Sequence, residues 1–219
     1  METETIYHIQ TITHGAAHSG EVFSLSYERP EGAKAPETHG QLVYLTGEGL
    51  ELSMWCCEEN PRAVYHQPND PVHTDSCVEM FLNCFPDLPE YGYIGLEINA
   101  NGASHCSFGT GRHTRTYLLD LGLPHPAVRA ERYVEQGQSC WRVTCLLKQS
   151  LLEALYERDC AFQPGYRMRG NFYKCGDGTE FPHWASWAPL ERVDFHVPEL
   201  FGEFVIQSKP KMLANEKNT

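Results

Sequence analysis

Two short segments in the middle of the chain alternate apolar and polar side chains with a period of two, and they constrain the fold most strongly. They are Cys77–Leu82 and Ile94–Ala100. One side of the two segments is apolar, and the other side carries Glu79, Glu97 and Asn99. Such alternation is typical of strands that have one face on an apolar core. The apolar side consists of Val78, Met80, Leu82, Leu96 and Ile98.

Strand-like runs separated by Gly- and Pro-rich turns recur along the whole chain, and only one segment reads as a helix. That helix is Gln149–Arg158, in which Ser150 is a candidate N-cap and leucines form an apolar stripe. Ala100–His105 and Gly109–Arg115 read as polar loops. The pattern predicts an all-β fold, an antiparallel β-sandwich of jelly-roll type with one short helix. The other predicted strands are Ile6–Thr13, Glu21–Tyr27, Gln41–Leu45, Leu50–Glu58, Trp141–Leu147, Asn171–Cys175, Trp184–Trp187 and Glu203–Gln207.

The length of 219 residues fits a single domain, because sandwiches of this size commonly fold as one unit. No internal repeat and no break in composition marks a second domain. We therefore expect one sandwich over residues 1–207, followed by a polar tail, Ser208–Thr219, that contributes little to folding.

The charge of the chain disfavours two classes of partner. Seventeen basic and 29 acidic residues give a net charge of −12, which repels nucleic acids and anionic membranes. No apolar run is long enough to span a bilayer, and Met1–Gln10 does not resemble a secretion signal. These features predict a cytoplasmic protein.

Cysteine and histidine are abundant, but their spacing favours neither disulfides nor a metal. Nine cysteines, an odd number at irregular spacing, predict free thiols and a reducing compartment. The two groups considered as metal ligands are His105 and Cys106 with His113, and Cys175 with His183. No CxxC spacing is present, which argues against a tetrahedral zinc site.

The segment Asn171–Phe204 holds eight aromatic residues among turn formers and charges. Two of them are Trp184 and Trp187, half of the tryptophans in the chain. So many rings near strand ends indicate either a plug at one end of the sandwich or a surface for a flat ligand.

Five motifs, in order along the chain, together resemble the family-9 carbohydrate-binding modules, specifically a single-domain branch of that family. The resemblance spans about residues 40 to 207. It implies a β-sandwich that binds sugars without cleaving them, linked to carbohydrate catabolism. In the xylanase-attached members, two aromatic rings clamp a sugar unit while a carboxylate, an amide and basic groups bind its hydroxyls. The motifs are Val72–Phe81, Ile94–Gly102, Asn171–Asp177, Pro182–Pro189 and Asp194–Phe204.

By position, the resemblance places the binding carboxylate on Glu79. His73 and Phe195 stand where the family has tryptophan rings, and Glu97 stands where it has a strand arginine. No cofactor is expected, although calcium sites occur in the wider family and the resemblance leaves calcium open. The candidate sugar-binding residues are His73, Glu79, Glu97, Asn99, Arg112, Asn171, Tyr173, Trp187 and Phe195.

Two other functions stay open at this stage. Asp75 and Glu79 could form the carboxylate pair of a glycan-acting hydrolase, or of an accessory domain of one. A haem-binding redox domain would need an axial methionine and histidine, with Met54, Met80 or Met168 as the methionine. A sugar site could also lie at the loop end of the sandwich, around Trp184 and Trp187.

Overall fold

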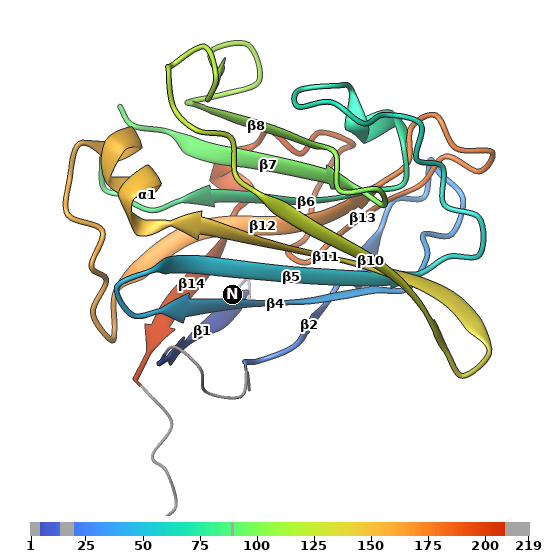
Figure 1. Cartoon of the computed structure of the whole chain (residues 1–219), viewed down its shortest axis with the longest axis horizontal. Helices are drawn as coiled ribbons and strands as arrows, with labels where there is room; N and C mark the ends of the chain where they lie inside the picture. The colour runs from blue at the N-terminus through green and yellow to red at the C-terminus, as the bar shows by residue number, and fades with distance from the viewer. Residues whose placement is uncertain (1–4, 14–19, 89, 209–219) are drawn as a thin grey trace, which may run out of the picture.

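The computed structural model describes residues 5–13, 20–88 and 90–208, and it confirms the all-β fold with one short α-helix (Figure 1). The elements are β1 Ile6–Ile12, β2 Phe23–Ser24, β3 Tyr27–Glu28, β4 Thr38–Leu45, β5 Gly49–Cys57, the 3-10 turn η1 Val72–Thr74, β6 Cys77–Asn83, β7 Tyr93–Asn99, β8 Ser104–Gly109, β9 Thr116–Tyr117, β10 Val128–Glu135, β11 Gln138–Lys148, α1 Gln149–Tyr156, β12 Arg167–Cys175, β13 Trp184–Ser186, the 3-10 turn η2 Pro198–Leu200 and β14 Gly202–Gln207.

The strands form one sheet that curls on itself, in the order β10-β11-β5-β4-β1-β14-β12-β6-β7-β8-β9. The half with β4, β5 and β11 packs against the half with β12, β6 and β7, and both contribute side chains to one apolar core. Pairing is antiparallel between described strands, except that β1 runs parallel to both β14 and β4. The predicted sandwich is confirmed, and its sheet is mixed at the first strand.

The alternation of the two central strands has the predicted consequence. Val78, Met80 and Leu96 are fully buried in the core. On the opposite face, Glu79 of β6 lies directly across from Glu97 of β7. The same row continues to Tyr173 in β12 and to His105 in β8, so four neighbouring strands carry one line of polar side chains.

The sequence pattern does not predict three strands, β8, β9 and β10. Ser104–Gly109 pairs with β7, although its first residues were expected to lie in a loop. Val128–Glu135 is an edge strand with largely exposed side chains, so no apolar alternation marks it. The helix α1 buries its predicted leucines, but its N-cap position is Lys148 rather than Ser150, and no side chain caps it.

The expectation that no disulfide forms is wrong. Cys57 and Cys140 lie opposite each other on the neighbouring strands β5 and β11 and are disulfide-bonded. Spacing along the chain could not show this, because strand pairing brings together residues that are 83 positions apart. The other seven cysteines are free and buried.

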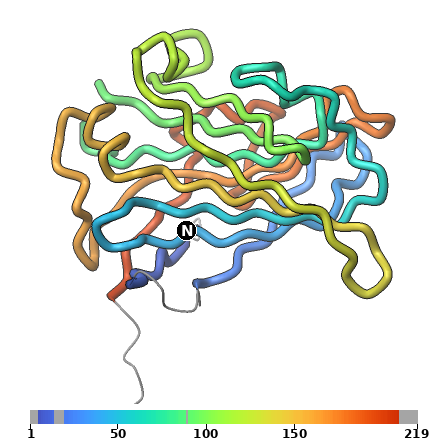
Figure 2. Tube along the Cα trace, in the orientation of Figure 1, coloured from blue at the N-terminus to red at the C-terminus, as the bar shows by residue number. Residues whose placement is uncertain are grey.

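The Cα trace shows α1 at one end of the sandwich and the long loops around residues 60–76 and 176–190 at the other (Figure 2). No helix among the described residues is long and apolar enough to cross a membrane. The predicted polar tail lies outside the described residues after Ser208, so its contribution to folding stays a prediction.

Candidate functional site

A pocket of about 180 Å³ opens on the polar face of β6 and β7. Its floor comes from these strands, and its walls come from η1, the 109–115 loop and the 176–197 segment. Loops that are distant in sequence therefore meet over the row of polar side chains. The lining residues are His73, Glu79, Glu97, Arg112, Arg115, Cys175, Asp177, Trp184, Val193, Asp194, Phe195 and His196.

The floor holds two carboxyl groups that are almost completely buried. Glu79 and Glu97 are each 3% exposed and lie opposite each other across the strand pair. Burial raises the pKa of Glu97 to about 7, while Arg115, whose Nη1 is 3.4 Å from Glu97 Oε1, acts in the opposite direction. Burial first, and then the charge of Glu97, raise the pKa of Glu79 well above its ordinary value. The pair therefore favours holding a proton near neutral pH.

His196 forms part of the wall as a neutral imidazole. Its Nε2 accepts a hydrogen bond from Arg115 Nη1 at 2.7 Å, so its proton belongs on Nδ1, which lies 2.7 Å from the Tyr93 hydroxyl. Burial, together with the neighbouring arginine, lowers the pKa of His196 to about 3. Arg115 is thereby fixed between an imidazole acceptor and the Glu97 carboxylate, with its donors directed at the pocket floor.

Phe195 lies in the pocket wall, and Tyr173 supports it from behind. The two rings are stacked, with centroids 4.1 Å apart and planes 8° from parallel. The Tyr173 hydroxyl donates a hydrogen bond to the Phe195 carbonyl oxygen at 3.1 Å. Because Tyr173 is fully buried, it positions the phenylalanine ring.

Trp184 supplies a larger and partly exposed ring. Its indole Nε1 donates to Asp177 Oδ1 at 2.7 Å, which fixes the orientation of the ring. The turn that carries Asp177 is in turn bonded to η1, since Asp177 N donates to the His73 carbonyl oxygen at 3.2 Å. A Cβ at Gly178 would lie only 2.8 Å from the Thr74 carbonyl oxygen, so this approach requires glycine. The hydrogen bonds made by Asp177 therefore fix Trp184 and His73 relative to each other.

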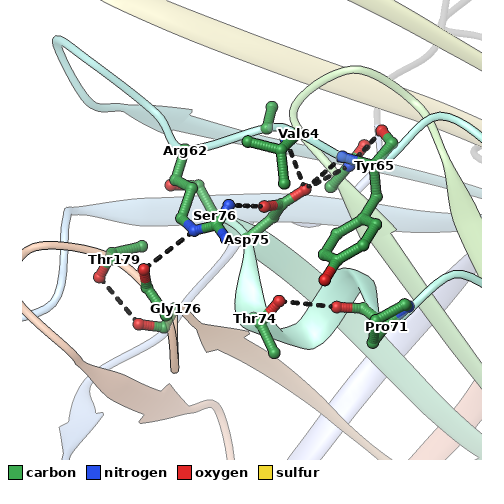
Figure 3. A network of polar contacts seen from close by, with 12 residues as sticks. Arg62, Val64, Tyr65, Pro71, Thr74, Asp75, Ser76, Gly176 and Thr179 are labelled. Atoms are coloured by element: carbon green, nitrogen blue, oxygen red, sulfur yellow. Dashed lines mark hydrogen bonds and ion pairs between the residues drawn. The ribbon is translucent and has the colours of Figure 1, made fainter.

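A buried carboxylate, Asp75, anchors the loop that carries His73 (Figure 3). Arg62 Nη1 donates to Asp75 Oδ1 at 2.8 Å, and the backbone N–H groups of Val64 and Tyr65 donate to Oδ2 at 2.9 and 3.1 Å. Asn99 Nδ2 also donates to Oδ2, at 2.9 Å, which ties the loop to the end of β7. Arg62 reaches further, from Nε to the Gly178 carbonyl oxygen at 2.9 Å.

Five of the nine predicted sugar-binding residues line the pocket. The shared face predicted for the strand residues is confirmed by their register. The five pocket-lining residues are His73, Glu79, Glu97, Arg112 and Phe195.

The other four predicted residues do not line the pocket, because their side chains bond to or pack against other parts of the protein. Asn99 bonds Asp75 and the backbone of its own turn, and Tyr173 lies behind Phe195. Asn171 exchanges hydrogen bonds with the backbone of Ala188. Trp187 packs in the apolar core, with ring centroids 5.4 Å from Phe204.

Arg115, His196 and Asp177 belong to the pocket and were missed. Arg115 belongs to a predicted polar loop, and the residues next to it in the sequence do not indicate that its side chain faces Glu97. Asp194 was also missed, and it accepts a hydrogen bond from Arg112 at 2.9 Å. Trp184 had been considered only as an alternative location. Strand alternation cannot predict which loop residues fold over a sheet face.

The structure gives no support to the other functions. Both oxygens of Asp75 accept bonds from protein donors and Asp75 does not line the pocket, so it does not form a hydrolase pair with Glu79. The three candidate haem-ligating methionines are fully buried in the apolar core. Calcium binding stays a prediction: the two three-residue clusters of metal-capable side chains among the described residues each contain two cysteines, whereas calcium takes oxygen ligands.

Comparisons with known proteins bear on the family and the fold of this chain. A model of carbohydrate-binding family 9 matches residues 29–206. A candidate carbohydrate-binding protein from Bacteroides uniformis has a similar structure, with a TM-score of 0.74, 24% identity and coverage of 94% of this chain and all of that one. No curated protein sequence matches.

Two structures of a family 9 carbohydrate-binding module from Caldicellulosiruptor kristjanssonii are also similar, each with 11% identity. The complex with cellotriose has a TM-score of 0.61 and covers 98% of this chain and all of that one. The complex with glucose has a TM-score of 0.60 and covers 95% of this chain and 99% of that one. At these identities the likeness shows the fold.

Proposed function

Because this chain belongs to carbohydrate-binding family 9, we propose that its pocket binds a mono- or oligosaccharide without cleaving it. One observation carries the proposal: flat rings and buried hydrogen-bonding groups converge on a single pocket. His73, Trp184 and Phe195 supply the rings, and the Glu97–Arg115 pair supplies an acceptor beside a donor.

This combination suits the chemistry of a sugar. A pyranose presents apolar C–H faces, which pack on aromatic rings, and a rim of hydroxyls, each of which both donates and accepts. Glu97 accepts from one hydroxyl while Arg115 donates to the next, in a charge-assisted arrangement. The buried floor favours these bonds, because few waters compete for them.

The size of the pocket favours one sugar unit at a time. Its volume of about 180 Å³ lies below the range of roughly 300–1,000 Å³ found for drug-sized ligands. The related modules were solved with glucose and with cellotriose. We therefore propose that the pocket takes glucose or the terminal unit of a glucose-containing chain, with any further units outside it.

We expect weak affinity, on the order of micromolar to millimolar Kd, because a small sugar buries little area and its hydroxyls must lose water. Two of the rings are small, since they are an imidazole and a phenylalanine that is only 8% exposed. Trp184 is the largest stacking surface in the pocket.

Calorimetric titration with glucose, cellobiose and cellotriose tests the proposal. Replacing Trp184 by Ala should abolish measurable binding. The matched control is Trp55→Ala, which removes a partly exposed tryptophan that lies on β5 and outside the pocket. Equal affinity of the two variants would place the sugar elsewhere on the protein.

The absence of catalysis is a separate part of the proposal. Incubation with a panel of aryl glycosides should give no turnover above that of buffer. Turnover that Glu79→Gln abolished would instead favour the hydrolase alternative.

A further inference from the structure

Beside the sugar pocket, two cysteines and a glutamate form a compact cluster. Cys77, the first residue of β6, lies directly opposite Cys175, the last residue of β12. Glu79 follows two positions after Cys77, so all three side chains project from the same face of the sheet. Their ligand atoms all lie within 4.8 Å of one another, and Cys175 Sγ is 2.9 Å from Glu79 Oε1.

The side chains of the cluster are almost completely buried and have no positively charged partner in the part of the chain that the structure describes. Cys77, Cys175 and Glu79 are 0%, 2% and 3% exposed. No basic side chain of the described residues forms an ion pair with Glu79, because the nearby Arg115 is bonded to Glu97 and His196. Lys174 projects from the opposite face of β12, toward His183 and Glu58.

We propose that Cys77, Glu79 and Cys175 bind a thiophilic divalent cation of the Zn²⁺ class. Two thiolates and one carboxylate are ligands that Zn²⁺ accepts in tetrahedral geometry, whereas Ca²⁺ and Mg²⁺ prefer oxygen alone. The spacing along the chain gave no hint of this site. The ligands become neighbours only through the pairing of β6 with β12.

Three protein ligands leave a fourth coordination position, and this position faces the pocket. Glu79 and Cys175 both line the pocket, as does His73, whose carbonyl oxygen lies 3.5 Å from Cys175 Sγ. A water molecule from the pocket can complete the coordination. Zinc sites with three protein ligands and one open position are a recognised class.

A cation that binds here must displace the protons that the cluster holds. The Cys175 thiol donates its hydrogen to the Glu79 carboxyl group, and burial raises the pKa of the Cys77 thiol to about 11. A bound cation takes both cysteines as thiolates and Glu79 as a carboxylate, so the two thiol protons and any proton on Glu79 pass to solvent as the bonds to the metal form. The ion then supplies the positive charge that the surrounding side chains do not.

Titration of the chelator-treated full chain with Co²⁺, in the absence of sugar and with the Cys57–Cys140 disulfide intact, tests the site. We expect one equivalent to bind, with the thiolate-to-cobalt absorption in the near ultraviolet and the strong visible bands of tetrahedral cobalt. Zn²⁺ should displace it. Because no sugar is present, failure here leaves the sugar-binding proposal intact, and failure of sugar binding leaves this one intact.

Cys77→Ala and Cys175→Ala should each remove the near-ultraviolet band. Cys106→Ala is the matched control, because Cys106 is equally buried but lies in the core away from the pocket. Glu79→Gln, which keeps both thiols, should weaken binding at least tenfold and serves if the alanine variants do not fold. The proposal is overturned if the wild-type protein shows no such band, or if the band persists unchanged in folded Cys77 and Cys175 variants.

Discussion

At the scale of single residues, His196 shows how the pocket fixes a protonation state. Its two ring nitrogens have different partners, since one accepts from Arg115 and the other faces the Tyr93 hydroxyl. Protonation would place a second positive charge against the guanidinium group in a largely buried wall. The neutral imidazole is therefore part of the structure of the site.

This arrangement predicts a specific pH dependence of stability. The folded-state pKa of His196 is lowered from 6.5 to about 3. Because the pKa is lowered in the folded state, the neutral imidazole makes its full contribution to stability above the unfolded-state pKa of 6.5. That contribution is lost as the pH falls from 6.5 to about 3. The Tm of the wild-type protein should therefore fall more steeply on acidification than the Tm of His196→Gln.

Thermal melts of both proteins at several values between about pH 7 and pH 4.5 measure this difference. His113→Gln is the control, because His113 is exposed and its loss should leave the pH profile unchanged. Parallel profiles for wild type and His196→Gln would contradict the assignment.

His73 is the ring whose size most directly limits affinity. Its side chain is 46% exposed at the pocket rim, so a larger ring fits without displacing core groups. His73→Trp should tighten sugar binding by about 0.5–1.5 kcal/mol, the usual contribution of an added aromatic contact. Calorimetry with cellobiose measures it. His66→Trp, in the same loop but outside the pocket, should have no effect.

The sequence predicted the direction of side chains in the site better than their partners. Period-two alternation correctly placed Glu79, Glu97 and Asn99 on one face. The alternation could not show that the Asn99 side chain donates to Asp75, because the Asp75 carboxylate lies in an irregular loop. Residue type indicates what a side chain can bind, but the loop conformation decides what it does bind.

At the scale of elements, the far end of β12 depends on a buried lysine. Lys174 is fully buried, and its Nζ lies 2.9 Å from the Cys175 carbonyl oxygen, 2.7 Å from His183 Nε2 and 3.8 Å from Glu58 Oε2. Such a charge is stable in the interior only with all of its partners in place. This network connects β12 to β13 and to the end of β5.

Replacing Lys174 by Met should lower the free energy of unfolding by about 3 kcal/mol, because the Glu58 carboxylate and a buried carbonyl group lose their partner. Urea denaturation measures the change. Lys148→Met is the control, since Lys148 is exposed at a strand end. Adding Glu58→Gln to Lys174→Met should recover part of the loss, and a strictly additive double variant would count against the pairing.

The disulfide between β5 and β11 makes a second element-scale prediction. It links residues 83 positions apart, and the loop-closure entropy for a loop of that length stabilises a fold by about 4 kcal/mol. Thiol titration in denaturant should find seven groups before reduction and nine after it, in keeping with the seven free cysteines. Nine before reduction would contradict the bond.

The cytoplasmic location stays a prediction. The disulfide weakens the argument for it that rested on free cysteines.

The elements that the sequence missed have a common physical cause. An edge strand such as β10 buries little, and β8 is short and largely polar, so neither shows the apolar alternation that marks a strand. The parallel pairing of β1 is likewise decided by the closure of the whole sheet, since β1 lies between β4 and β14. Strands with one apolar face, including β5, β6, β7 and β11, were predicted correctly.

At the scale of the whole molecule, the curled sheet separates stability from recognition. The core between the two halves of the sheet is apolar. The pocket lies on the outer face of β6 and β7, and the loops that cover it are connected by hydrogen bonds at Asp75 and Gly178. Sequence alone predicted the sandwich and the polar face of the sheet on which the pocket opens. The loops that complete it were not predictable, because their positions depend on contacts between distant segments.

The central claim is that sugar binds in this pocket, and a titration of ¹⁵N-labelled protein with cellobiose, followed by two-dimensional NMR, tests it most directly. The predicted result is that the largest shift changes cluster at His73, Glu97, Asp177 and Trp184, with a matching loss in Trp184→Ala. Saturable shifts confined to the Trp55 face of β5, or no saturable shifts at millimolar sugar, would contradict the account.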